Sequence, residues 1–261
     1  MQQTWLINGP PGCGKTNWIL ETLRQHSGPC AYLRLDGFSR EGLAAGMNAG
    51  VDRAWLCDQI PHLQDLSQSA SLEAMPSQDS LVLVEVQQFR PPVNRSLEGL
   101  DPQVMEQLNR FQLNPVRVLY FGLDSDLPKH DTLNFTKLEA WNLNLQGCVW
   151  DPNSLSSFWF ELVNGAYGDV YRAKALMNLP DGRSFFCNWM VSQEGSQFLP
   201  LEAVQPPTGR PNRLSHLVVQ GKALDPDGMQ STIDDCLLAD EVLAMQQAQL
   251  RQQQPDLQPT R

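Results

Sequence analysis

The residue pattern with the clearest chemistry is a glycine-rich loop near the start of the chain, Gly9-Pro10-Pro11-Gly12-Cys13-Gly14-Lys15-Thr16. It fits G-x-x-x-x-G-K-[ST], in which backbone N–H groups converge on phosphates, the lysine reaches the outer phosphates and the hydroxyl ligates magnesium. The glycines supply backbone angles that side chains would forbid. The residues expected to bind Mg²⁺ with a nucleoside triphosphate, GTP or ATP, are Gly9, Gly12, Cys13, Gly14, Lys15 and Thr16.

Two carboxylates are expected to complete this site. Asp36 follows one predicted strand, and Glu85 lies at the end of another, Leu81–Val84. Ligands gather at the carboxyl ends of parallel strands, where an acid holds the magnesium-bound water or orients the attacking water. The predicted magnesium ligands are therefore Thr16, Asp36 and Glu85. The alternative for both acids is an ordinary polar residue at a strand end.

The elements around the loop predict a parallel sheet. A strand over Gln3–Asn8, a helix from the loop to Arg24 and a strand over Cys30–Leu35 form a βαβ unit. Further interior strands are expected at 81–86 and 116–121, with helices over 105–111 and over part of 55–66, where Pro61 should break the helix. Residues 1–147 are thus predicted to form an α/β, P-loop three-layer sandwich with a mostly parallel sheet.

The second half predicts a smaller α+β domain with an antiparallel sheet over residues 148–243. Helices are expected at 153–162 and 226–238, with strands at 170–179, 184–191, 196–204 and 213–220 separated by Gly/Pro turn signals. Arg172 and Lys174 share one face of a strand, where one interpretation is that both are solvated. The aromatic residues predicted to be core are Trp150, Phe158, Trp159, Phe160, Phe185, Phe186 and Trp189. The Gln-rich residues 244–261 are expected to extend the last helix and then fray, partly disordered.

Composition narrows the function classes. The 261 residues carry 19 Lys and Arg against 29 Asp and Glu, a net charge of −10, which disfavours nucleic acid as a partner. No apolar run approaches the roughly 20 residues of a membrane helix, and no signal peptide precedes the loop. The six cysteines form no CxxC pair. We therefore expect a cytoplasmic protein with reduced cysteines and no membrane association.

With both halves considered, the chain resembles the CobW family of P-loop GTPases, which act in metal insertion and trafficking. The loop, Asp36 and Glu85 match its nucleotide domain. Val170-Tyr171-Arg172-Ala173-Lys174-Ala175 and the segment 213–225 look like the "R-A-K-G" and "R-L-V-F-I-G-…-L-D" strands of its C-terminal domain. The resemblance implies GTP hydrolysis, a zinc or cobalt delivery role, and a C-terminal domain that packs on the nucleotide domain and engages a protein partner.

Three departures from the family pattern matter. The C-x-C-C metal motif is absent; its interval holds only Cys57, with His62 five residues on, a pair better explained by core packing than by a metal site. The guanine-reading N-K-x-D motif is missing, although Asp124 could still accept two N–H bonds from guanine, so GTP is not indicated over ATP. Glu85 is followed by Val86-Gln87-Gln88-Phe89 without a switch glycine, which predicts slow hydrolysis or binding without turnover, with Gln87 or Gln88 as alternative water-positioning residues.

The leading hypothesis is a P-loop NTPase with Lys15 and Glu85 as its catalytic residues and water attacking the γ-phosphate in line. The alternative is a nucleotide-binding regulatory or scaffold protein that hydrolyses little or nothing. A small-molecule kinase shares the loop but needs an arginine-rich lid, which the sequence does not display.

Overall fold

The computed structural model describes residues 3–9, 12–35, 50–68, 79–87, 102–121, 139–192 and 194–253. Its internal contacts divide the chain into two compact units. The first unit comprises residues 1–48 and 52–136, and the second comprises residues 137–261 with 49–51. Among the described helices, none has the length and apolar character to span a bilayer.

The first unit is built on one parallel sheet in the order β3-β2-β4-β1-β5. Its strands are β1 (Gln3–Gly9), β2 (Cys30–Leu35), β3 (Gln64–Asp65), β4 (Leu81–Gln87) and β5 (Pro115–Tyr120). The β1 strand lies in the interior of the sheet, between β4 and β5, and apolar residues on both of its faces are buried, Leu6 on one and Ile7 on the other. The parallel sheet predicted from the βαβ pattern is confirmed.

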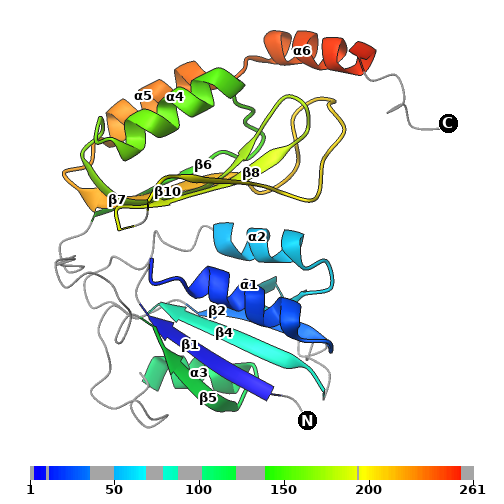
Figure 1. Ribbon diagram of the computed structural model, residues 1–261, viewed down its shortest axis with the longest axis vertical. Helices are drawn as coiled ribbons and strands as arrows, with labels where there is room; N and C mark the ends of the chain where they lie inside the picture. The colour runs from blue at the N-terminus through cyan, green and yellow to red at the C-terminus, as the bar shows by residue number, and fades with distance from the viewer. Residues whose placement is uncertain are drawn as a thin grey trace. The chain divides into compact units, whose positions relative to one another are not determined.

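Helices cover both faces of this sheet (Figure 1). On one face, α1 (Lys15–Gln25) and α2 (Val51–Gln59) pack against the side chains of Ile7, Tyr32 and Leu83. On the other face, α3 (Pro102–Arg110) and the short 3₁₀ helix η1 (Leu66–Gln68) pack against Leu6, Leu33 and Val84. Successive residues along each strand therefore pack into two separate cores, one on each face of the sheet, as a three-layer sandwich requires.

Two elements of the first unit differ from the sequence-based expectation. The α2 helix begins at Val51, earlier than the expected Trp55, and ends at Gln59, just before Pro61. The β5 strand was expected in the interior, but it ends the strand order of the described sheet, and Val116 is 69% exposed. A run of apolar residues does not distinguish an edge strand from an interior one. The position of a strand in the sheet depends on which other strands pair with it, and these are distant in the sequence.

The second unit is a five-stranded antiparallel sheet in the order β6-β10-β7-β8-β9. Its strands are β6 (Glu139–Asn144), β7 (Asp169–Asn178), β8 (Ser184–Met190), β9 (Gln197–Pro200) and β10 (His216–Lys222). Sequence analysis did not anticipate β6, which pairs with β10. This pairing places the division of the chain at residues 136 and 137, earlier than the expected boundary after residue 147.

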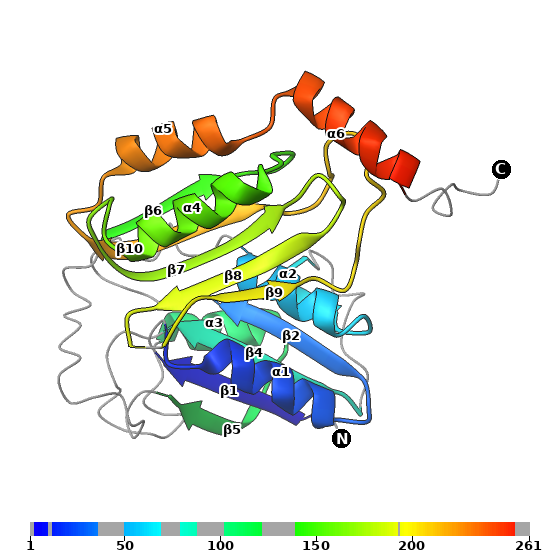
Figure 2. The ribbon, with the colours of Figure 1, turned by 45° about the horizontal axis from the view of Figure 1, so that its top comes forward.

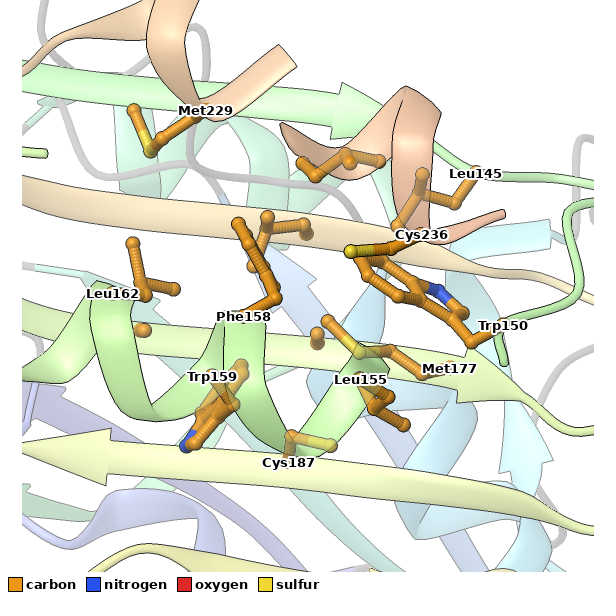
Figure 3. Close-up of a cluster of buried hydrophobic side chains, with 14 of the residues drawn as sticks. Leu145, Trp150, Leu155, Phe158, Trp159, Leu162, Met177, Cys187, Met229 and Cys236 are labelled. Atoms are coloured by element: carbon orange, nitrogen blue, oxygen red, sulfur yellow. The ribbon is translucent and has the colours of Figure 1, made fainter. Parts of the chain in front are cut away.

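Two helices lie over one face of this second sheet, α4 (Pro152–Val163) and α5 (Pro226–Cys236) (Figure 2). The Asp151 side chain caps α4 by accepting from the N–H groups of Asn153 and Ser154. The core between helices and sheet includes Trp150, Phe158, Met177 and Met229 (Figure 3). Most of the predicted aromatic core is thus confirmed, but Phe160 is 68% exposed because it points away from the sheet side of α4.

The opposite face of the second sheet carries two buried cations. Arg172 and Lys174 share a face of β7, as the alternation predicts, but each is only 8% exposed, so neither is a solvated surface residue. The Arg172 guanidinium donates to Gln220 at 2.9 Å, and the Lys174 ammonium lies 5.4 Å from the centre of the Phe186 ring. The interpretation of these residues as solvated is therefore wrong.

A last helix, α6 (Asp240–Gln253), occupies much of the Gln-rich region expected to be partly disordered. The Gln247 side chain donates to the Gly209 carbonyl and accepts from its N–H, and Arg251 donates to the Pro207 carbonyl. The Gln247 amide and the Arg251 guanidinium thus fix α6 to the loop before β10. Residues 254–261 lie outside the described part of the chain.

The core of the second unit depends on the ring of Phe158, which is 1% exposed and lies 5.3 Å from Trp150 and 5.9 Å from Tyr167 between ring centres. We expect Phe158→Ala to lower the free energy of unfolding by about 3–5 kcal/mol, because it leaves a cavity. The matched control on the same helix is Phe160→Ala, which should change it by less than about 0.5 kcal/mol. Urea denaturation measures both, and equal losses would contradict this packing.

Candidate functional site

The glycines of the P-loop are required by its backbone. Gly12 and Gly14 both have φ of 84°, in the left-handed region that favours glycine. A Cβ on Gly9 would lie 2.9 Å from the Phe121 carbonyl oxygen and 2.9 Å from the Cys13 sulfur, closer than real contacts permit. The loop therefore turns tightly beside the end of β5. Pro10 and Pro11 lie outside the described residues.

The loop leads directly into α1. Gly14 is the N-cap of this helix and, having no side chain, provides no capping hydrogen bond to its first amides. The helix has no acidic residue in its first turn. A helix N-terminus that receives no side-chain cap from Gly14, and whose first turn holds no acidic residue, is suited to receive an anion.

Lys15 is buried, and its ammonium is held by groups around the loop. It donates to the Gly9 carbonyl at 2.8 Å and lies 3.7 Å from Glu85 Oε1 on β4. It also lies 3.7 Å from the sulfur of Cys13. The structure thus brings Lys15, Glu85, Gly9 and Cys13 together, as the sequence predicts for a phosphate site.

Glu85 has a second partner that sequence analysis missed. The Tyr32 hydroxyl donates to Glu85 Oε2 at 2.5 Å from the neighbouring strand β2. Burial and then the charge of Glu85 raise the pKa of the Tyr32 phenol well above its ordinary value. The phenol therefore stays protonated at neutral pH and remains a donor to the carboxylate. Because Tyr32 and Glu85 are 0% and 2% exposed, this contact is protected from water.

Thr16 contacts an acid other than the expected ones. Its hydroxyl donates to Asp52 Oδ1 at 3.1 Å, and Asp52 Oδ2 accepts from Arg34 at 2.9 Å. Asp52 lies in the first turn of α2, and Arg34 lies on β2 in register with Glu85. Burial alone would lower the pKa of the Arg34 guanidinium, but the charges of Glu85 and Asp52 raise it above its ordinary value. Arg34 is therefore a permanent cation between two acids.

Part of this network had a sequence signal that was overlooked. Arg34 stands in an otherwise apolar strand in which every residue is buried. A charged residue at such a position needs a buried partner of opposite charge, so Arg34 alone indicates an acid nearby. The identity of that acid, Asp52, had no such signal, because an acid in the first turn of a helix is common on a protein surface.

Several predicted site residues are not tested by the structure. Asp36, Asp124 and Gln88 lie outside the described residues, as does the side chain of Gln87. Cys57 lies on α2 and packs partly against the core beneath α1, and burial raises the pKa of its thiol. Within the described ranges, no three His, Cys, Asp or Glu side chains are grouped to hold a metal ion.

Two buried polar groups lie on the α3 side of the sheet, next to the loop. Both side-chain atoms of Asn8, which is fully buried, and the hydroxyl of Tyr120 have no hydrogen-bond partner in the described part of the chain. The two residues are register partners on β1 and β5. An unpaired buried amide costs stability, so such groups are concentrated where a ligand or water completes them.

No family model and no curated protein matches this sequence. Among solved structures, the Zn(II)-bound YjiA GTPase from E. coli aligns with 90% of this chain and 98% of its own, at 10% identity and a TM-score of 0.32. A Zn(II)-bound triple mutant of YjiA aligns with 90% and 99%, at 11% identity and a TM-score of 0.31. Similarity at this level carries no conclusion about function, which rests on the site itself.

The Arg34–Asp52 pair is expected to be essential for the stability of the first unit. We expect Arg34→Met to lower the free energy of unfolding by about 3–5 kcal/mol, because it leaves a buried carboxylate without its cation. The control is Arg110→Met, which removes a pair with Glu106 in which the arginine side chain is 72% exposed. That loss should be near zero because water screens the pair. Urea denaturation compares the two, and a mild effect at Arg34 would show that the pair is dispensable.

Proposed function

We propose that the first unit binds a nucleoside triphosphate, GTP or ATP, with Mg²⁺ and hydrolyses its γ-phosphate slowly. The observation that carries this proposal is the position of Lys15 and Thr16. Both are buried at the N-terminus of α1, where one side chain is next to Glu85 and the other is hydrogen-bonded to Asp52. Cation, hydroxyl and two carboxylates are the groups that a magnesium–phosphate complex needs.

The donor set suits magnesium. The Thr16 hydroxyl and the carboxylates of Asp52 and Glu85 are hard oxygen donors, which Mg²⁺ prefers over nitrogen or sulfur. Thr16 would hold the ion directly, and the two acids would hold it or its water ligands. Asp36, predicted as a further ligand, remains part of this proposal. When bound, Mg²⁺ neutralises charge on the outer phosphates.

Lys15 supplies the charge that the transition state requires. Its partners include the Gly9 carbonyl and, at 3.7 Å, the Glu85 carboxylate, and anionic phosphate oxygens are stronger acceptors than a carbonyl. Together with the amides at the start of α1, the ammonium would stabilise the negative charge that develops as water attacks the γ-phosphate in line.

The surroundings of Glu85 favour slow turnover. One of its oxygens accepts from Tyr32 and the other is close to Lys15, so an attacking water would compete with protein groups for both oxygens. Orienting an attacking water requires a free acceptor in hydrogen-bond reach. The same observation supports the alternative function, a nucleotide-binding regulatory or scaffold protein with little or no hydrolysis.

The finer parts of the proposal rest on the family resemblance alone. They are cytoplasmic metal delivery, with zinc or cobalt, and a protein partner bound through the second unit. The segment of the second unit that resembles the family, residues 170–175, is where partner binding should be tested first.

Lys15→Ala tests the binding site. We expect a fluorescent GTP analogue with Mg²⁺ to bind wild-type protein with micromolar affinity and to be displaced by GTP and ATP, and we expect binding to be lost in the variant because the phosphates lose their cation. The control is Lys222→Ala, which removes a lysine that lies against Tyr171 in the second unit and should bind normally. Failure of the folded wild-type protein to bind would refute the proposal.

Glu85→Gln separates hydrolysis from binding. Glutamine retains an acceptor for Tyr32 but loses the charge, so we expect nucleotide affinity to stay within about threefold while phosphate release falls by about 100-fold. Thermal unfolding of the variant checks that it is folded. If wild-type phosphate release does not exceed that of Lys15→Ala, the alternative without hydrolysis is the better description.

A further inference from the structure

An aromatic cluster lies beside the P-loop, on the α1 side of the sheet. The ring of Trp18, on α1, meets the ring of Phe121 edge-on at 5.4 Å between centres, and the ring of Trp5, on β1, at 6.4 Å. All three residues are partly buried and pack at the margin of the core beneath α1. Each of the three residues thus keeps some accessible surface.

Two of these aromatic residues are joined to the loop by backbone contacts. The Phe121 amide donates to the Asn8 carbonyl at 2.8 Å, and its own carbonyl oxygen lies where a side chain on Gly9 would begin. The Trp18 amide donates to the Gly14 carbonyl at 3.1 Å, in the first turn of α1. Trp18 and Phe121 are therefore fixed relative to the phosphate-binding backbone.

The strand order determines on which side of the loop the nucleoside lies. The acids and the Thr16 contact are on the side of β4 and β2, because Glu85 is on β4 and Asp52 is paired to Arg34 on β2. The outer phosphates and magnesium belong on that side. The β5 strand, which ends next to Phe121, is on the other side of β1. A nucleotide with its γ-phosphate near Glu85 therefore directs its nucleoside toward Phe121 and Trp18.

We infer that the Trp18–Phe121 pair is the stacking platform for the nucleobase, and that this platform takes either purine. The inference rests on the proposed nucleotide binding and specifies how the base is held. Stacking on an aromatic ring tolerates different bases because each has a π-face, whereas hydrogen bonds to the base edge discriminate between them. The sequence has no Asn-Lys pair after β5 to read guanine, and Phe121, directly after β5, is one member of the aromatic pair.

Trp5 belongs to the same cluster but has a different role. The Arg117 guanidinium lies 4.8 Å from the centre of its ring, so this ring already has a cationic partner. It also lies in the N-terminal half of β1, away from the loop end of the strand. Trp5 therefore contributes packing without reaching the base, which makes it the matched control.

Competition binding with three ligands tests the platform: GTP, ATP and inorganic tripolyphosphate, which has no base. In wild-type protein with Mg²⁺, we expect GTP and ATP to bind with affinities within about fivefold of one another and more tightly than tripolyphosphate. Phe121→Ala and Trp18→Ala should each weaken GTP and ATP alike, by about 5- to 100-fold, and leave tripolyphosphate unchanged. Phe121→Tyr, which keeps the ring, should restore nucleotide affinity.

The control variant Trp5→Leu should lower the melting temperature without changing the ratio of nucleotide to tripolyphosphate affinity. The inference would be overturned by an equal loss of all three ligands in Phe121→Ala, by unchanged nucleotide affinity in both alanine variants, or by a wild-type preference of more than about 100-fold for one purine. If wild-type protein binds neither nucleotides nor tripolyphosphate, the proposed function itself fails. Tripolyphosphate binding without any benefit from a base would refute only the platform.

Discussion

The first unit depends on a group of four charges buried beneath its P-loop. Lys15 and Arg34 face Glu85 and Asp52, and all four side chains are at most 8% exposed. Burying isolated charges is prohibitively unfavourable, so each of these residues requires the others to be in place. Strands β2 and β4 and helices α1 and α2 must therefore come together for any of the four to be tolerated. The contacts that make these buried charges tolerable therefore also position groups for phosphate and magnesium.

This dependence connects stability with activity. Tyr32 and Arg34 lie on the same face of β2, and both donate to acids of the site, Glu85 and Asp52. A free carboxylate at Glu85 would serve hydrolysis better, whereas a paired one serves the fold better. The contacts of Glu85 favour the stability of the fold, and we expect slow turnover as the consequence. The unpaired amide of Asn8 is the opposite case, a group at the loop that the described residues leave without a partner.

The second unit depends on an apolar core on one face of its sheet. Its helices α4 and α5 cover one face of the antiparallel sheet with an aromatic and aliphatic core. Its other face buries Arg172 and Lys174, although alternation along a strand gave no indication whether such residues are solvated. The period of the sequence identifies residues that share a face, but the environment of that face is set by residues distant in the sequence. The same limitation explains the misplaced β5 and the unforeseen β6, which pairs with β10.

The sequence by itself determined the P-loop, the βαβ start, the central strands and the positions of Lys15, Thr16 and Glu85, because these depend on local patterns: glycines at fixed spacing, apolar runs and residues at strand ends. Only the tertiary structure decided that Thr16 contacts Asp52, that Tyr32 and Arg34 serve the acids, and that Phe121 and Trp18 meet beside Gly9. These contacts join residues from separate strands and helices. Their proximity follows from strand order and register, which no local pattern specifies.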